Sequence, residues 1–319
     1  MEKLRKSKSF FTLKWQKHLF YAIINSVIIM LNITFVCTGN TCRSAMAEGL
    51  FKKILAERGI TDITCRSCGL AAYTGDEASP QAVEVCAERG ADLSYHRATV
   101  FNQYILDETD IMVCMTESHK NAVMKINPTF RVLVPDGGIP DPFGGDTEIY
   151  RDCADKIEAF LERFIDSITM NIVPMSEENI KEIAELEKVS FSVPWSENGL
   201  RAELSNENAH FLTAVSDGKV LGYIGIHEIC GEAYITNVAV FPEYRRLGIG
   251  ETLIDAATHG AKQRNCEFIS LEVRISNTPA IELYKKEGYN IVGQRKNFYS
   301  NPTEDAYIMT RVLKDCETK

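Results

Sequence analysis

The sequence has 319 residues, of which 45% are hydrophobic and 25% are charged. This length exceeds that of a usual single domain, and the composition is that of folded globular proteins, which excludes a disordered chain. The net charge is −9, and the first 29 residues are rich in lysine, so the rest of the chain is still more acidic and argues against a nucleic-acid-binding surface.

The cysteines and the N-terminal residues bear on the compartment. Ten cysteines are spread over the chain rather than concentrated in a short secreted domain, so a reducing cytoplasm is expected. Residues 19–36 are apolar enough to suggest a signal peptide or a membrane span. Asn25 and Asn32 interrupt this run, and its last part is needed as a strand. Membrane association is therefore not expected, and residues 1–29 are interpreted as an N-terminal extension that is disordered or stems from a mis-assigned start.

From Leu31 onward, short apolar runs alternate with helical patterns. The expected order is strand 31–37, helix 44–58, strand 62–66, helix 80–90, strand 110–115, helix 117–127, strand 131–134 and helix 147–168. Strands that alternate with helices form a parallel sheet with helices on both faces. Residues 30–169 are therefore predicted to form one α/β domain.

A second pattern starts near Met170, and residues 170–319 are predicted to form a second α/β domain. Residues 171–191 indicate a strand, a turn and an amphipathic helix. The expected elements that follow are strands 209–216, 219–228 and 232–241, helix 248–263, strand 267–273 and helix 278–287. The sequence contains no flexible linker between the two halves.

The first strand leads into the segment Cys37-Thr38-Gly39-Asn40-Thr41-Cys42-Arg43-Ser44, and a helix follows at once. A loop at a helix N-terminus directs free backbone N–H groups into one concavity, which suits a phosphate. The helix dipole and Arg43 both favour a thiolate at Cys37, which can attack phosphorus and form a phosphocysteine intermediate. Arg43 can bind two phosphoryl oxygens through its planar fork, and Ser44 is placed to donate a hydrogen bond to the thiolate.

The segment FVCTGNTCRSAMAEGLF resembles the low-molecular-weight protein tyrosine phosphatase family, and the match extends over about residues 31–168. It includes Pro140-Asp141-Pro142-Phe143-Gly144-Gly145-Asp146, far downstream. The resemblance implies a flavodoxin-like parallel-sheet fold, with Asp141 as general acid and later as the base that activates water. By itself an Asp-Pro pair is more typical of an ordinary turn. Phosphate or substrate contacts are expected from Thr38, Gly39, Asn40, Thr41, Cys42, Ser44 and Phe143.

Two departures from the tyrosine phosphatases bear on the substrate. Thr41 stands where they usually carry an aliphatic residue, and Phe143-Gly144-Gly145 stands where they carry tyrosines. Both features resemble the bacterial protein-arginine phosphatases, which favours phosphoarginine and keeps phosphotyrosine as the alternative. Arsenate reductases are disfavoured, because Cys86 has no cysteine partner at a suitable spacing. The pair Cys65 and Cys68 lacks a second pair, so packed thiols are expected rather than a metal site.

A glycine-rich segment in the second half, Arg245-Arg246-Leu247-Gly248-Ile249-Gly250, follows the apolar strand YITNVAVF and opens a helix. Glycines let a backbone approach a pyrophosphate closely, and N–H groups at the helix start can bind its oxygens. A glycine-rich turn is a weak signal alone, because helix packing also selects it. The pattern of the complete domain therefore has to show whether this segment binds a pyrophosphate or only packs a helix.

Residues 170–313 resemble the GNAT (acyl-CoA N-acyltransferase) family, whose acetyl-CoA motif R/Q-x-x-G-x-G/A follows a strand NVAV. The resemblance implies acetyl-CoA as cosubstrate, and no metal. It also implies that strand 235–240 splays from strand 268–273, so that its backbone can pair with pantetheine. Acetyl-CoA contacts are expected from Val238, Val240, Arg245, Arg246, Gly248, Ile249, Gly250 and Asn277, of which Asn277 can also cap helix 278–287.

Three segments, FSVPWSE, LEVRISNTPAIELYKKEGY and RKNFYSNPTEDAYIM, resemble the RimI group of ribosomal-protein-alanine N-acetyltransferases. An amine must lose a proton before it attacks a thioester, and the departing thiolate gains from receiving one. The spacing matches both RimI catalytic positions, which makes Glu272 the base and Tyr284 the acid. Viewed singly, an exposed strand carboxylate and a packed core tyrosine are the alternatives. Trp195 either lines the peptide entrance or packs within its loop.

Together the two resemblances imply a bifunctional, cytoplasmic bacterial enzyme. Its expected partners are phosphorylated proteins and the N terminus of a ribosomal protein, with no direct binding to nucleic acid. One alternative is a different amine substrate for the second half. Another is a regulatory protein in which one domain has become a binding module, and complete catalytic sets in both halves argue against it.

Overall fold

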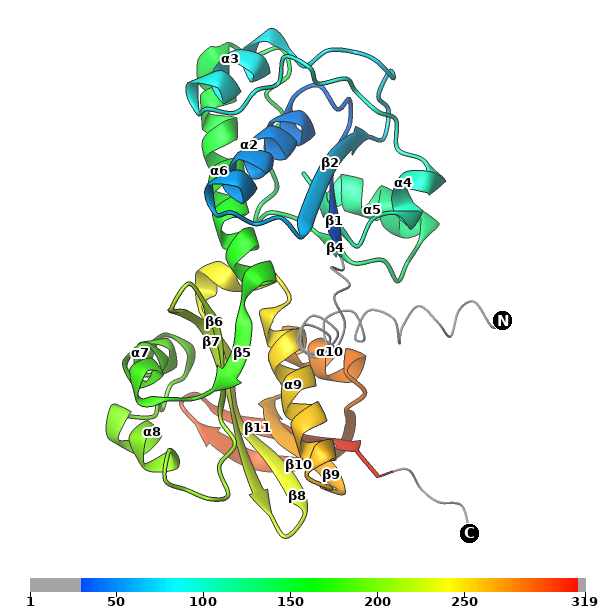
Figure 1. Cartoon of the computed structure of the whole chain (residues 1–319). Helices are drawn as coiled ribbons and strands as arrows, with labels where there is room; N and C mark the ends of the chain where they lie inside the picture. Colours follow the sequence, from blue (N-terminus) through cyan, green and yellow to red (C-terminus); the bar gives the residue numbers. More distant parts are fainter. Residues whose placement is uncertain (1–29, 315–319) are drawn as a thin grey trace. The chain divides into compact units, whose positions relative to one another are not determined.

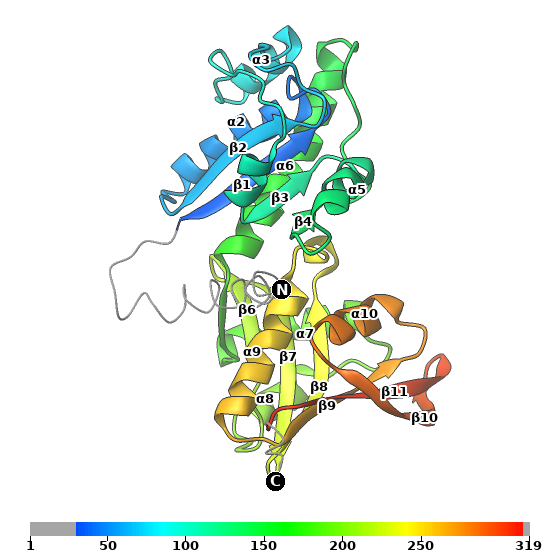
Figure 2. The ribbon, with the colours of Figure 1, turned by 90° about the vertical axis from the view of Figure 1, so that its right-hand side faces the viewer.

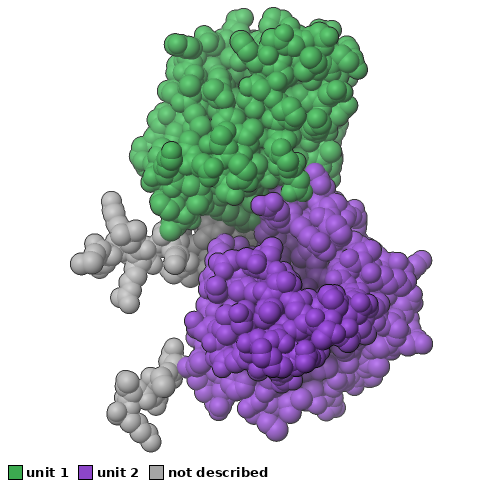
Figure 3. Space-filling model, turned by 180° about the vertical axis from the view of Figure 1, so that it is seen from behind, with its two compact units in different colours: residues 1–162 green, residues 163–319 purple. Residues whose placement is uncertain are grey.

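The structure is a computed structural model that describes residues 30–314 (Figure 1). The interpretation of residues 1–29 therefore lies outside the described part of the chain. Two compact units divide the chain between residues 162 and 163, and Figure 3 colours them separately. No helix among residues 30–314 combines the length and the apolar character that are needed to cross a membrane.

The first unit alternates strands and helices, as the apolar pattern predicts. Its elements are β1 (Leu31–Cys37), α2 (Arg43–Glu57), β2 (Ile63–Gly69), α3 (Pro80–Glu88), α4 (Gln103–Asp107), β3 (Ile111–Cys114), α5 (Glu117–Ile126), β4 (Val132–Leu133) and α6 (Thr147–Thr169). The four strands form one parallel sheet in the order β2-β1-β3-β4. The division between the two units falls within α6.

Helices cover both faces of this sheet, which explains why consecutive residues of β1 are buried from Ile33 to Cys37. Phe35 packs edge-on against Phe51 of α2, with ring centroids 5.6 Å apart. The next residue, Val36, points to the opposite face and packs in a cluster with Ile105 of α4 and Val123 of α5. Strand β1 therefore lies between helices on its two faces (Figure 2). This packing on both faces holds the carboxyl end of the strand, at Cys37.

The second unit is built on a mixed sheet of seven strands. Its elements are β5 (Asn171–Pro174), η1 (Glu177–Asn179), α7 (Ile180–Ser190), α8 (Glu197–Glu203), β6 (Leu212–Ser216), β7 (Lys219–Ile229), β8 (Glu232–Val240), η2 (Pro242–Tyr244), α9 (Ile249–Gln263), β9 (Phe268–Arg274), α10 (Thr278–Lys286), β10 (Asn290–Ser300) and β11 (Thr303–Val312). The strand order is β10-β11-β9-β8-β7-β6-β5. Helix α7 packs on Tyr223 of β7, and α9 approaches the other face of β7 at Gly222.

Strands β8 and β9 are the parallel pair of this sheet, and they separate part-way along their length. Pairing runs only from Glu232 opposite Phe268 to Ile235 opposite Leu271. Beyond Ile235, β8 stays paired with β7 up to Val240, while β9 stays paired with β11. The two arms therefore diverge and leave unpaired backbone between them.

The structure corrects several predicted boundaries. Strand 62–66 extends to Gly69, because its last residues pair in register with β1 up to Cys37. Strand 209–216 begins only at Leu212, since Ala209 makes an isolated bridge. The short helices α4 and α8 and the hairpin β10–β11 were not predicted. The two helices are too short to show the 3.6-residue hydrophobic period of an amphipathic helix. Strand β10 is largely exposed, so it lacks the apolar alternation that marks a half-buried strand.

Candidate active sites

The loop that joins β1 to α2 forms the first candidate site. Strand β1 ends at Cys37 and α2 begins at Arg43, so residues 38–42 lie at the N-terminus of a 15-residue helix. Asn40 adopts a left-handed conformation, with φ of 58°, which asparagine tolerates better than most residues. This geometry gathers backbone donors and the positive end of the helix dipole at the carboxyl end of β1.

Gly69 of the neighbouring strand allows this loop to form. A Cβ atom at this position would lie 2.5 Å from the carbonyl oxygen of Thr38 and 2.9 Å from the amide nitrogen of Asn40. Distances this short do not occur for real side chains, so any other residue would push the loop away. The position therefore requires glycine for close approach of two backbones.

The thiol of Cys37 is buried at the base of the loop and meets two polar groups. Its Sγ atom lies 2.9 Å from the hydroxyl of Ser44 and accepts a hydrogen bond of 3.2 Å from the backbone N–H of Asn40. Both contacts can stabilise negative charge on sulfur. Ser44 is thus at donor distance, as the sequence predicts.

A chain of buried hydrogen bonds orients the Ser44 hydroxyl. The side-chain amide of Asn40 donates to Ser44 at 2.9 Å and to Ser67 at 2.7 Å, and its oxygen accepts from the N–H of Thr99 at 2.8 Å. Ser67 donates in turn to the carboxylate of Glu48 at 2.5 Å. Because Ser44 already accepts from Asn40, its own hydrogen can point at the Cys37 sulfur, 2.9 Å away, or at the more distant carbonyl oxygen of Cys68, at 3.4 Å.

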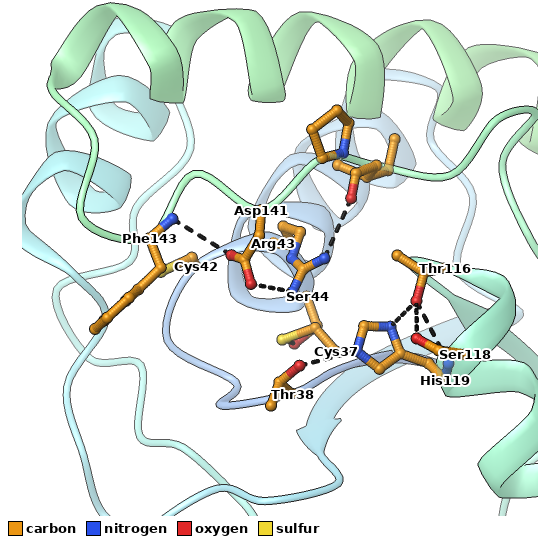
Figure 4. Close-up of polar contacts among 12 residues, drawn as sticks. Cys37, Thr38, Cys42, Arg43, Ser44, Thr116, Ser118, His119, Asp141 and Phe143 are labelled. Carbon is orange, nitrogen blue, oxygen red and sulfur yellow. Dashed lines mark hydrogen bonds and ion pairs between the residues drawn. The ribbon is translucent and has the colours of Figure 1, made fainter.

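Arg43 and Asp141 come together although 98 residues separate them. An Nη atom of Arg43 lies 2.7 Å from Asp141 Oδ2, and the other Nη donates to the carbonyl of Ile139 at 3.2 Å. Figure 4 shows the Asp141 carboxylate beside the Arg43 guanidinium. The side chain of Arg43 is 5% exposed and that of Asp141 is 52% exposed, so Asp141 faces solvent while Arg43 is enclosed. The Nε of Arg43 is buried without a partner among the described residues, which suits a phosphoryl oxygen.

The remaining expected contact residues take different positions. Phe143 is 78% exposed, and its N–H donates to Asp141 Oδ1 at 3.3 Å. The sulfur of Cys42 lies 2.8 Å from the Ser79 hydroxyl and 3.1 Å from that of Tyr150, so its backbone rather than its thiol is available to a phosphate. Burial raises the pKa of Tyr150 to about 12. Thr41 is half-buried, with its hydroxyl 3.6 Å from the Cys42 sulfur.

His119 lies beside the cradle and was not predicted from the sequence. Its Nε2 atom is 3.0 Å from the hydroxyl of Thr38, and its Nδ1 atom is 2.8 Å from that of Thr116 (Figure 4). Thr116 caps α5 by accepting the N–H of His119. Burial and, second, the charge of Arg43 lower the pKa of the imidazole, so neutral His119 joins α5 to the loop at neutral pH.

This lowered pKa predicts a dependence of stability on pH. A histidine with a folded-state pKa below its unfolded value contributes stability above the unfolded value, and loses it as the pH falls through the folded one. Heat resistance of the phosphatase activity should therefore decline from about pH 7 to pH 5 less steeply in His119→Gln than in the wild type. Residual activity after heating at each pH measures this, and equal declines would contradict the assignment.

The second candidate site lies where β8 and β9 diverge. Helix α9 begins at Ile249, after Gly248 with φ of 93° and Arg246 with φ of 64°. The first N–H groups of this 15-residue helix lack helical acceptors, so they can bind pyrophosphate oxygens. Arg245 and Arg246 are exposed beside them, and Arg245 also donates to the carbonyl of Val240 at the end of β8. Val238 and Val240 are half-buried on the β8 arm.

Glu272 and Tyr284 lie on the β9 side of the divergence. Glu272 directly follows the last β9 residue that pairs with β8, and it forms an ion pair of 3.3 Å with Arg295. Its carbonyl accepts from the hydroxyl of Tyr299 at 3.2 Å. Tyr284 is buried on α10, and burial raises the pKa of its phenol, which keeps the hydroxyl protonated at neutral pH.

For Asn277 and Trp195 the sequence allowed two roles each. The side chain of Asn277 caps α10 by accepting the N–H of Ala280 at 3.3 Å. Trp195 packs against Phe211, with ring centroids 5.9 Å apart, and against His227 at 6.5 Å. The packed alternative for Trp195 is therefore present in the structure.

Comparison with known proteins agrees with the family resemblance of each half of the chain. The family described as low molecular weight phosphotyrosine protein phosphatase matches residues 32–175, and the acetyltransferase (GNAT) family matches residues 180–289. The protein-arginine-phosphatase of Bacillus subtilis (strain 168) is 36% identical over 142 residues, which cover 42% of this chain and 93% of that protein. The [ribosomal protein bS18]-alanine N-acetyltransferase of Escherichia coli (strain K12) is 33% identical over 128 residues, 39% of this chain and 84% of that protein. The chain belongs to both families.

The low molecular weight phosphatase half also resembles enzymes named for another substrate. The low molecular weight protein-tyrosine-phosphatase PtpB of Staphylococcus haemolyticus (strain JCSC1435) is 36% identical over 130 residues, 38% of this chain and 88% of that protein. These two relatives are equally identical to this chain, so their identity alone does not select the substrate.

Two features of the phosphatase half concern metals. Burial raises the pKa of Cys65 and of Cys68 to about 12, so both are packed thiols at neutral pH. Residues 30–314 contain no group of three or more His, Cys, Asp or Glu side chains that could hold a metal ion.

Sequence reasoning missed the supporting residues of both halves. Ser67 and Glu48 could have been found as polar positions on the buried side of a strand and a helix. His119 follows a predicted strand at the start of a helix. In the GNAT half, Glu187 falls seven residues after Ile180 on the apolar face of α7, where a carboxylate is unexpected.

Proposed function

We propose that the chain joins a protein phosphatase, residues 30–169, to an acetyl-CoA-dependent N-acetyltransferase, residues 170–319. The observation that carries the first activity is the meeting of Cys37, Ser44, Arg43 and Asp141 at one loop. The divergence of β8 from β9 beside Glu272 carries the second. The free thiols of all described cysteines support a cytoplasmic location.

The phosphatase reaction has two steps. The thiolate of Cys37 attacks phosphorus while Arg43 holds phosphoryl oxygens, and Asp141 gives its proton to the departing oxygen or nitrogen. The resulting phosphocysteine is then hydrolysed by a water molecule whose proton passes to the Asp141 carboxylate. Phosphate leaves, and the Cys37 thiolate is restored with the Ser44 hydroxyl as its hydrogen-bond donor.

The favoured substrate is phosphoarginine in proteins, and phosphotyrosine is the alternative. Thr41 supports this choice, because its hydroxyl lies in the phosphate loop and is half-exposed. A hydroxyl there can place a polar guanidinium or the attacking water above Cys37, whereas an aliphatic side chain cannot. The exposed Phe143 next to Asp141 is suited to contact the substrate side chain.

Thr41→Ile tests this specificity, since it keeps the branched shape but removes the donor. Activity on phosphoarginine should fall by about tenfold or more, while activity on phosphotyrosine is retained or rises, because sites built around a hydrogen bond discriminate strongly. The measurement is the ratio of kcat/KM for the two substrates. Thr129→Ile, at an exposed turn of the same unit, is the matched control, and an unchanged ratio in Thr41→Ile would remove the main support for phosphoarginine.

In the second half, side chains of this protein act as general base and general acid in acetyl transfer. Acetyl-CoA supplies an activated acetyl thioester, and the N–H groups at the start of α9 with Arg245 and Arg246 are suited to hold its pyrophosphate. Glu272 accepts the proton of the attacking amine, directly or through one water, and Tyr284 donates a proton to the departing sulfur. The proposed acceptor is the N-terminal amine of a ribosomal protein that starts with alanine.

The rival proposal is that one half only binds its target and regulates the other. Assays of phosphoarginine and phosphotyrosine peptides, run beside acetyl transfer to a peptide that starts with alanine, decide between the two. Turnover in both assays supports the bifunctional enzyme. Binding without turnover in either half would support the regulatory alternative.

A further inference from the structure

A carboxylate with no assigned role is buried in the core of the acetyltransferase half. Glu187 is 0% exposed and lies on α7 among the apolar residues of the helix face that packs on the sheet. Buried carboxylates are costly unless hydrogen bonds compensate for the lost water.

Three donors from separate elements converge on Glu187. Its Oε1 accepts from the hydroxyl of Tyr223 on β7 and, at 2.8 Å, from the side-chain amide of Asn237 on β8. Its Oε2 accepts from the backbone N–H of Trp195 at 2.8 Å, in the loop between α7 and α8. The carboxylate therefore ties this loop to the middle of the sheet.

Asn237 and the loop of residues 191–196 both lie beside the proposed site of acetyl transfer. Asn237 follows Ile235, the last β8 residue paired with β9, so it belongs to the diverging arm. The loop of residues 191–196 reaches the other arm, because Ser192 Oγ lies 3.5 Å from a guanidinium nitrogen of Arg274. Arg274 follows the proposed base Glu272 by two residues on β9.

We propose that Glu187 is a positioning residue for acetyl transfer, which fixes the loop of residues 191–196, the acceptor loop, against the diverging arm of β8. The acceptor loop forms the wall along which the peptide amine approaches Glu272. This inference rests on the acetyltransferase activity proposed above.

The consequences of removing the carboxylate differ for the two substrates. The β8 arm keeps its pairing with β7 from Val238 to Val240, so the backbone that faces acetyl-CoA stays in place. The acceptor loop keeps the core packing of Phe191 and Trp195 and the long contact of Ser192, but the N–H of Trp195 loses its charged partner. A buried hydrogen bond to a charged group is stronger than an aromatic pair, so loss of Glu187 should release the loop.

The test uses Glu187→Ala, Glu187→Gln and the control Glu185→Gln, which changes an exposed carboxylate on the same helix. In Glu187→Ala the KM for the acceptor peptide should rise by about tenfold or more, whereas the KM for acetyl-CoA should change less than about threefold. Glu187→Gln should be intermediate, because it retains one acceptor oxygen for the Trp195 N–H. Equal changes in both KM values, or none, would overturn the proposal.

A second readout is independent of turnover. The chain has two tryptophans, so a Trp15→Phe background leaves Trp195 as the single reporter. Acrylamide quenching of Trp195 should increase in Glu187→Ala and remain as in wild type in Glu185→Gln. If the alanine variant does not fold, wild-type KM values and quenching in Glu187→Gln would overturn the proposal. Failure of the wild type to acetylate any peptide would count against the activity, while quenching still tests the loop.

Discussion

Cys37→Ser abolishes phosphatase turnover and leaves acetyl transfer at its wild-type rate: this is the expected result of separate active sites. Serine retains the size of the side chain but is a far weaker nucleophile at neutral pH, and its neighbours Ser44 and Asn40 are donors rather than bases. The fall in kcat should be on the order of 10³-fold or more, by analogy with the loss of other nucleophiles.

The control for this experiment is Cys65→Ser, which makes the same exchange outside the phosphate loop. Cys65 is half-buried on β2, and its thiol makes a long contact of 3.8 Å with the carbonyl oxygen of Glu48, which a serine hydroxyl can also make. Phosphatase activity should persist in this variant. Loss of both activities in a folded Cys37→Ser protein would refute two independent catalytic sites.

Glu272→Gln should lower the kcat of acetyl transfer by about 10²–10⁴-fold, because a positioned general base contributes on that order. Glutamine keeps the shape of the side chain but cannot accept the proton of the amine. Affinity for acetyl-CoA should change little, since Glu272 is on β9 and the proposed pyrophosphate contacts are at the start of α9. A loss below about threefold would reject the role of Glu272.

Tyr284→Phe tests the proposed general acid of the same reaction. The phenol is buried, and its raised pKa keeps the proton available up to alkaline pH. The variant should therefore lose kcat while retaining affinity for acetyl-CoA. Glu267→Gln is the matched control for both variants, because Glu267 is an exposed carboxylate just before β9 that pairs with Lys314. Its kcat should equal that of the wild type.

The sequence predicted most of what depends on local pattern. The run from Leu31 to Cys37 is mostly apolar because both faces of β1 are covered, so its role as a buried strand was predictable. Asn40 and Ser44 contact Cys37 because all three residues belong to one short segment, the end of β1, the loop after it and the first turn of α2. For the same reason, the cap formed by Asn277 was predictable from its position before α10.

Contacts made over long distances in sequence were not predictable in this way. The chain from Asn40 through Ser67 to Glu48 needs the register of β1 against β2, which no local pattern supplies. The partners of Glu187 lie 36 and 50 residues downstream, on β7 and β8. Helical periodicity marks Glu187 as facing the core, but only the tertiary structure shows which donors meet it.

The close approach at Gly69 has a consequence for mutational tolerance. Alanine there would place its methyl group within 3 Å of two backbone atoms of the phosphate loop, an overpacking that typically costs about 1–3 kcal/mol. The loop could relieve this only by moving away from β2, which would also displace the amide of Asn40 from the nucleophile. A scan of all single substitutions should thus find Gly69 as intolerant as Cys37, although glycine has no side chain that could contact a substrate. In this enzyme, sensitivity to mutation is therefore no guide to which residues contact the phosphate.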